Sequence, residues 1–132
     1  VKRGINISYK NDGKNKYLIY GIENRIEQII ANLLDNAISF SDDDKDVIVQ
    51  VSKSEDSKVY IKILDEGQGF KEKDTNKIFK RFYSNRPDKF GQHSGLGLNI
   101  VKNLVDLHNA TIKATNREDK KGASMEIEFP KV

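Results

Sequence analysis

The order of strand-like and helix-like segments predicts an α+β domain with its helices on one face of a mixed sheet. Several short segments alternate apolar with polar residues, which is typical of strands that are buried on one side. Two longer segments repeat apolar residues at helical spacing. Two glycine pairs, Gly67 with Gly69 and Gly95 with Gly97, bracket a long segment that has neither period.

The length and composition limit the possible functions. The chain has 132 residues, enough for one compact domain. Its 23 Lys and Arg residues exceed its 20 Asp and Glu residues by three and are evenly spread, so the charge does not indicate nucleic-acid binding. The chain has no Cys, and His93 and His108 are the only histidines, which argues against thiolate and multi-histidine metal sites. The first residue is not Met, so we expect a piece of a longer protein.

The first third of the chain predicts two strands and a helix. Alternation over residues 5–9 and an apolar run over 17–22 indicate two strands joined by a turn at 11–13. An apolar stripe at helical spacing predicts a helix over about residues 24–40. Asn24 followed three residues later by Glu27 has the form of a capping box, so we expect the helix to begin there.

A second pair of strands follows. Residues 47–52 and 59–64 alternate apolar and polar side chains and are separated by a polar turn, which predicts two further strands. The acidic residues at 42–46 are expected to form a solvated loop with no assigned role. The second of these strands leads directly into Asp65 and the first glycine turn.

The last third predicts a long loop, a helix and a hairpin. Residues 70–94 have no long periodic segment, and loops of that length in small domains are usually functional or disordered. Helical spacing returns over 97–108, and residues 112–114 and 125–129 predict a closing hairpin around 117–122. The loop contains one short apolar cluster that fits one or two helical turns: Ile78, Phe79, Phe82 and Tyr83.

The glycine turns and three polar residues are candidates for ligand binding. Gly95 and Gly97 directly precede a helix, where free backbone N–H groups can face a phosphate, although such a pair more often only punctuates a helix. Asn32 and Asn36 lie four residues apart on one helix face, and carboxamide oxygens suit Mg²⁺, although a solvent-facing pair is the simpler interpretation. Asp65 either caps the adjacent turn or accepts a hydrogen bond from an exocyclic amine.

Neither of the common nucleotide motifs is present. The chain has no G-x-x-x-x-G-K-[ST] run and no G-x-G-x-x-G after its first strand, so P-loop and Rossmann folds are disfavoured. Any nucleotide must therefore be bound by another arrangement.

Four motifs stand in order along the chain: Asn32 to Ala37, Asp65 with the first glycine turn, Lys77 to Tyr83, and Ser94 to Val101. In order and spacing they resemble the N, G1, F and G2 boxes of the catalytic ATP-binding domain of sensor histidine kinases, which has the Bergerat-type ATP fold. The resemblance spans about residues 24–108, and the flanking strands extend it over essentially the whole chain. The stretch from Arg81 to Pro87 is also similar to the ChvG-type kinases.

The resemblance implies a fold and a domain organisation. The fold would be a two-layer α/β sandwich, in which a mixed, mostly antiparallel sheet of about five strands packs on about three helices. Residues 1–132 would form one catalytic and ATP-binding domain, with an ATP lid over about 70–94. The dimerisation domain that carries the phosphoacceptor would be absent. The parent protein would be a homodimer anchored in the bacterial inner membrane, with this domain in the cytoplasm and monomeric when isolated.

The resemblance also assigns roles to residues in the first two boxes. Asn36, with Asn32, would hold Mg²⁺ that bridges the phosphates of ATP, so both count as catalytic. Asp65 would accept a hydrogen bond from the adenine amino group, and Gly67 and Gly69 would shape the base pocket.

The lid and the second glycine turn would bind the rest of the nucleotide. Arg81 would lie near the phosphates as a third catalytic residue, and Phe79 and Phe82 would anchor the lid. The segment that faces the phosphates would consist of five residues: Ser94, Gly95, Leu96, Gly97 and Leu98.

In this family the γ-phosphoryl group passes to a histidine on a separate helical domain and then to a response regulator. Catalysis is mostly positioning and charge neutralisation. Neither His93 nor His108 has the acceptor context, a helix with an acidic residue following. Ser39 stands where many members have a basic residue. His108-Asn109-Ala110 replaces a common His-Gly-Gly, so we expect Asn109 to adopt the left-handed conformation.

Three alternatives remain open at this point. The ATP-hydrolysing relatives of the fold have a Glu general base at the position of Asn32, and without a carboxylate there we expect slow hydrolysis. A serine kinase of the anti-sigma-factor type shares three of the boxes, but the aromatic cluster around Phe79 favours the histidine kinase. A non-enzymatic module, either a nucleic-acid binder or a pseudokinase that does not bind ATP, is the third.

Overall fold

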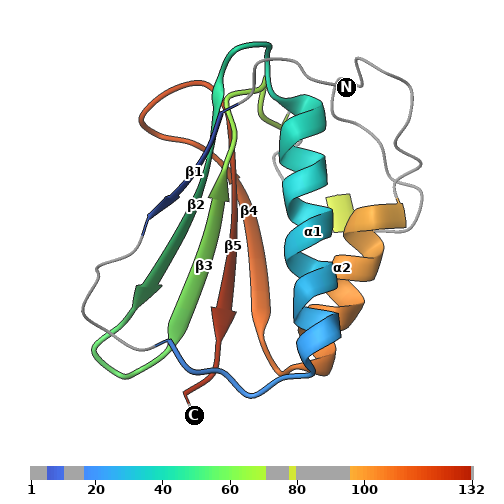
Figure 1. The fold of residues 1–132 in the computed structure, drawn as a ribbon, viewed down its shortest axis with the longest axis vertical. Helices are drawn as coiled ribbons and strands as arrows, with labels where there is room; N and C mark the ends of the chain where they lie inside the picture. The colour runs from blue at the N-terminus through green and yellow to red at the C-terminus, as the bar shows by residue number, and fades with distance from the viewer. Residues whose placement is uncertain (1–5, 11–16, 71–77, 80–95, 132) are drawn as a thin grey trace.

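The computed structural model describes residues 6–10, 17–70, 78–79 and 96–131. One five-stranded sheet has the order β1-β2-β3-β5-β4, in which β1 runs parallel to β2 and every other neighbouring pair is antiparallel. Both helices cover the same face of this sheet, so the predicted two-layer α+β sandwich is confirmed (Figure 1). In chain order the elements are β1 (Asn6–Lys10), α1 (Glu23–Phe40), β2 (Asp46–Lys53), β3 (Val59–Leu64), α2 (Leu96–Leu107), β4 (Thr111–Asn116) and β5 (Ala123–Phe129).

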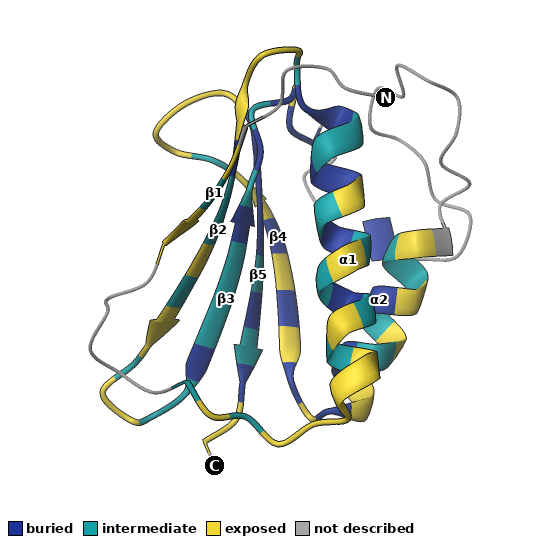
Figure 2. Cartoon of the chain, in the orientation of Figure 1, coloured by how far each residue is buried: buried dark blue, intermediate teal, exposed yellow. Residues whose placement is uncertain are grey.

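The two faces of the sheet differ in chemistry, which explains why the helices of the described residues all lie on one of them. Exposed and buried residues alternate along β4 (Figure 2). On the face opposite the helices, Lys62 of β3 lies 3.7 Å from the carboxylate of Glu126 on the neighbouring β5, and Lys58 lies 3.7 Å from that of Glu128. Charged cross-strand pairs of this kind are stable in water, so this face needs no second layer.

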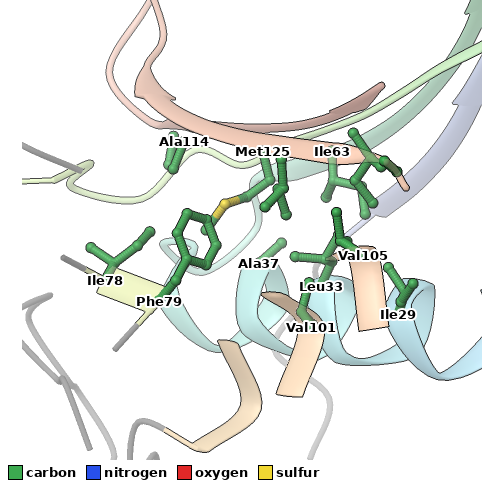
Figure 3. Close-up of a cluster of buried hydrophobic side chains, with 14 of the residues drawn as sticks. Ile29, Leu33, Ala37, Ile63, Ile78, Phe79, Val101, Val105, Ala114 and Met125 are labelled. Atoms are coloured by element: carbon green, nitrogen blue, oxygen red, sulfur yellow. The ribbon is translucent and has the colours of Figure 1, made fainter. Parts of the chain in front are cut away.

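The core lies between the helices and the inner face of the sheet (Figure 3). The buried apolar residues Ile29, Leu33 and Ala37 recur every four positions along α1. Val101 and Val105 have the same spacing in α2, so each helix presents one apolar stripe to the sheet. The side chains of Phe79 and Met125 point toward one another, so the short 3₁₀ turn at Ile78 and Phe79 contributes to this core. The labelled core residues are Ile29, Leu33, Ala37, Ile63, Ile78, Phe79, Val101, Val105, Ala114 and Met125.

The prediction that residues 5–9 and 17–22 form two strands joined by a turn is wrong. Residues 6–10 form the edge strand β1, but it pairs in parallel with β2, with Ile7 opposite Val47. Residues 17–22 form no strand and instead run to the start of α1 (Figure 1). Tyr17 and Ile19 pack against the core, whereas Leu18 is exposed. The apolar run therefore reflects packing against the end of the sandwich and not membership of the sheet.

The predicted capping box at Asn24 is also wrong. The N-cap residue of α1 is Ile22, and no side chain in the described part of the structure caps the helix at this position. The N–H of Ile22 instead donates a 3.1 Å hydrogen bond to Nε2 of His108, at the far end of α2. In a capping box the third-position Glu would accept from that N–H group, so a tertiary contact has replaced the local one.

The remaining described elements agree with those predicted from the sequence. The strands β2 and β3 pair in antiparallel fashion, Asn109 has φ 57° after α2, and β4 and β5 form the closing hairpin. Of the lid at 70–94 and the third expected helix, only Phe70, Ile78 and Phe79 lie within the described residues. Neither described helix is long and apolar enough to cross a membrane.

Candidate functional site

Asp65 is a buried carboxylate held in one orientation at the end of β3. It is 3% exposed, and its Oδ1 accepts hydrogen bonds of 3.0 Å from the N–H groups of both Gly67 and Ala123. Its own N–H donates to the carbonyl of Ala123 at 2.9 Å. The interpretation of Asp65 as a turn cap is therefore confirmed. A carboxylate fixed in this way is also preorganised to accept a further hydrogen bond from a ligand amine.

The turn after Asp65 needs glycine for close packing. A Cβ on Gly67 would lie 2.1 Å from the carbonyl oxygen of Phe40, the last residue of α1. Gly69 has φ 77°, and a Cβ there would lie 2.5 Å from Oδ1 of Asn116. The C-terminal end of α1 and the turn are thus in direct backbone contact, and Ser41 and Gly67 form an isolated β-bridge. This contact brings the first two predicted motifs together.

Asn36 lies one helical turn before Phe40, at the end of α1 that meets the turn. It is only 8% exposed, and among the described residues its side chain has no hydrogen-bond partner. Buried amides are nearly always paired, so a buried amide that has no partner among the described residues is a candidate for completion by a ligand. Asn32, one turn earlier, is partly exposed. A carboxamide oxygen at Asn36 is a hard donor of the type that Mg²⁺ accepts, so the residues fit the ion.

The start of α2 is the second candidate position for a ligand. Gly97 is exposed, and a Cβ built on it meets no described atom within 4 Å, so packing does not require glycine here. The first N–H groups of a helix have no partner within it and favour anions. Leu98 packs against the core, and Nδ2 of Asn99 donates to the carbonyl of Phe79 at 3.3 Å. Four predicted site residues lie outside the described residues: Arg81, Phe82, Ser94 and Gly95.

Sequence reasoning did not assign a role to Glu66, beside Asp65. One carboxylate oxygen of Glu66 accepts from the N–H of Asp46 at 2.8 Å, and the other lies 3.4 Å from Nζ of Lys120. The hydrogen bond from Asp46 and the contact with Lys120 lower the pKa of Glu66. Glu66 thus connects the start of β2 and the β4–β5 turn to the segment that follows Asp65.

Two further residues that the sequence did not indicate lie on the β4–β5 hairpin. Asn116 hydrogen-bonds the backbone of Phe70, and Arg117 hydrogen-bonds the carbonyl of Asp65. These pairs are separated by 46 and 52 positions in the chain, so no local pattern could have identified them.

Comparison with known proteins assigns this arrangement to a family. Residues 21–132 match the model of the histidine kinase-, DNA gyrase B-, and HSP90-like ATPase, HATPase_c. The chain belongs to this family. It is 36% identical over 128 residues to the sensor protein ChvG of Agrobacterium fabrum, an alignment that covers 92% of this chain and 21% of ChvG. The predicted resemblance to sensor histidine kinases, including the ChvG type, is confirmed.

Solved structures share this fold. The mycobacterial sensor histidine kinase MprB superimposes with a TM-score of 0.85 at 23% identity, covering 96% of this chain and 84% of that one. Full-length ShkA in complex with AMPPNP superimposes with a TM-score of 0.80 at 26% identity, covering 97% of this chain and 26% of ShkA. The HATPase_c chain spans about a fifth of the length of the curated relative ChvG. It is a nucleotide-binding catalytic domain of the type found in two-component sensor kinases.

Proposed function

We propose that this domain binds Mg-ATP and transfers the γ-phosphoryl group to a histidine on a separate helical dimerisation domain, for relay to a response regulator. The observation that carries the proposal is the buried carboxylate of Asp65, fixed by two backbone N–H groups beside the glycine turn. Family membership and the likeness to ShkA, which was solved with AMPPNP, support it.

The residues of the first two boxes bind different parts of the nucleotide. Asp65 accepts from the adenine amino group, and Gly67 and Gly69 bring the backbone close to the base. Asn36, with Asn32, holds Mg²⁺, which when bound neutralises charge on the phosphates. The buried amide of Asn36, which has no partner in the described part of the chain, supports this assignment.

The start of α2 and the lid complete the proposed site. The backbone of Leu96, Gly97 and Leu98 directs N–H groups of the helix start to the phosphates. A Cβ on Gly97 would meet no atom of the described residues within 4 Å, which is compatible with this role. Family resemblance alone assigns four further positions: Arg81 to the phosphates, Phe82 to the lid anchor, and Ser94 and Gly95 to the phosphate turn.

The chain's own residues favour transfer over hydrolysis. Asn32 stands where hydrolysing members of the fold have a general base, and an amide cannot take a proton from water at neutral pH. The domain therefore acts by positioning the phosphates for an incoming histidine. We propose that residues 1–132 form this single domain, with the lid over about 70–94. In this proposal the parent kinase is a homodimer in the bacterial inner membrane.

Substitution of Asp65 by Asn tests the adenine assignment. The amide still accepts from the Gly67 and Ala123 N–H groups, so the fold should persist. The loss of charge and of an acceptor oxygen should weaken ATP binding about tenfold or more in calorimetry. Asp106→Asn, on the exposed end of α2, serves as the control and should bind ATP as the wild type does. Unchanged affinity in Asp65→Asn would overturn the assignment.

The acceptor chemistry needs a separate experiment. The domain is mixed with the helical acceptor domain of a relative such as ChvG and labelled ATP. Label that is stable to base and lost in acid is phosphohistidine, as expected. The reverse stability would favour the serine kinase, and a wild-type domain that does not bind ATP would be a pseudokinase.

A further inference from the structure

The guanidinium of Arg117 holds the backbone of Asp65 through a hydrogen bond. The Arg117 side chain is 4% exposed, and its Nη1 donates a 3.1 Å hydrogen bond to the carbonyl oxygen of Asp65. Its Nε and Nη2 donate to the two carboxylate oxygens of Asp119 at 3.0 and 2.8 Å. The pKa of Asp119 is lowered, chiefly by these hydrogen bonds. The buried charge of Arg117 is therefore paired, and its remaining contact goes to the residue at the centre of the site.

Asn116, the neighbour of Arg117, holds the other end of the same turn. Its Oδ1 accepts from the N–H of Phe70 at 2.6 Å, and its Nδ2 donates to the carbonyl of Phe70 at 3.1 Å. The side chain thus pairs with one residue's backbone as a neighbouring strand would. Phe70 is buried in the core and ends the stretch that begins at Asp65. The two hairpin residues therefore fasten the segment 65–70 at both ends.

These contacts restrict the direction of the Asp65 carboxylate. A charged donor on the Asp65 carbonyl fixes the peptide plane that leads into Glu66, and charge-assisted hydrogen bonds are about twice as strong as neutral ones. With that plane and the Oδ1 bonds fixed, the carboxylate has one orientation. Preorganised acceptors lose less entropy when they bind a donor.

We propose that Arg117 and Asn116 are positioning residues for base recognition: from the β4–β5 hairpin they hold the segment 65–70 so that Asp65 meets the 6-amino group of adenine. The inference rests on the proposed function, because it assigns the support of the same nucleotide site. Neither residue touches the nucleotide in this proposal, and both act through the backbone of the turn.

The experiment compares two nucleotides that differ only at the recognised group. Purine riboside triphosphate carries hydrogen in place of the 6-amino group of ATP. The wild type should prefer ATP, and Arg117→Met should lower this preference about fivefold or more, because the backbone that carries the Asp65 carboxylate loses its bond from Arg117. Its affinity for purine riboside triphosphate should change less than about twofold. Arg117→Lys should restore part of the preference, and Asn116→Asp, which removes the donor to Phe70, should lower it.

A control variant and thermal unfolding separate positioning from general stability. Lys121→Met removes a charge from the exposed part of the same hairpin and should leave the preference unchanged. If Arg117→Met weakens both nucleotides equally as its unfolding temperature falls, the role is structural and the proposal is overturned. If Arg117→Met does not fold, Asn116→Asp provides the same comparison at the other end of the turn, because it removes the donor to the carbonyl of Phe70. A wild type that binds neither nucleotide refutes the proposed function itself, whereas binding with unchanged preference in the variants refutes only this inference.

Discussion

Nε2 of His108 accepts a hydrogen bond from the N–H of Ile22 at 3.1 Å, across 86 positions of the chain. Because Nε2 is the acceptor, Nδ1 carries the proton and donates to the carbonyl of Leu104 at 2.7 Å. The ring is buried and joins the C-terminal end of α2 to the entry of α1. It provides the acceptor that a local capping box would have provided.

Replacement of His108 by Leu should destabilise the domain by about 1 kcal/mol or more, because the N–H of Ile22 loses its acceptor. Urea unfolding measures the change, and His108→Gln, which keeps an acceptor, should lose less. Leu107→Gln is the control, since Leu107 is 59% exposed and should tolerate the change. Equal stability of His108→Leu and the wild type would show that the hydrogen bond contributes nothing.

Replacement of Asn36 by Leu should separate stability from ligand binding. Removal of a buried amide without a described partner should stabilise the nucleotide-free domain by about 1 kcal/mol. The same variant should bind Mg-ATP about tenfold more weakly or worse, because the proposed oxygen ligand of Mg²⁺ is lost. Thermal unfolding and calorimetry measure the two effects, with Asn103→Leu on the exposed face of α2 as the control. Wild-type affinity in Asn36→Leu would exclude the magnesium role.

Two glycine substitutions should have opposite effects on stability. Gly97→Ala should leave the free domain as stable as the wild type or up to about 1 kcal/mol more stable, because Ala is the better helix former. It should nevertheless weaken ATP binding, since in the proposed site the methyl group would stand where the phosphates approach. Gly67→Ala places a Cβ 2.1 Å from the carbonyl of Phe40 and should cost about 3 kcal/mol. If Gly97→Ala binds ATP normally, α2 does not begin at the phosphates.

Glu66→Gln should change how stability depends on pH. The pKa of Glu66 is lowered from its ordinary 4.5 in the folded domain, by the N–H of Asp46 and then by Lys120. A lowered carboxyl pKa stabilises the fold above the unfolded pKa and loses this effect as pH falls through the folded value. The free energy of unfolding of the wild type should therefore exceed that of the variant by about 0.5–1 kcal/mol near neutral pH.

Urea titrations from about pH 7 to pH 3 test this dependence, and the two proteins should converge at the acid end. Glu118→Gln, on the exposed part of the hairpin, is the control: its free energy of unfolding should match that of the wild type across this pH range. A difference between wild type and Glu66→Gln that is independent of pH would contradict the prediction.

The sequence by itself determined the helices, the closing hairpin and the family. Helical spacing along α1 and α2 and alternation along β2 to β5 are local patterns, and they predict local structure because each apolar face must be buried. The four ordered motifs identified the family because the turns and helix ends that shape such a site need particular residues, as Gly67 does at its contact with Phe40.

Only the tertiary structure decided what lies next to those motifs. The parallel pairing of β1 with β2, the acceptor that His108 offers to Ile22, and the support of Asp65 by Arg117 were not predicted. A strand's pattern states that it has a buried face but does not name its partner strand. Likewise, a polar side chain selects its partner from whatever groups the folded chain brings near it. In these cases the partners lie tens of positions apart, so the choice belongs to the packing of the whole domain.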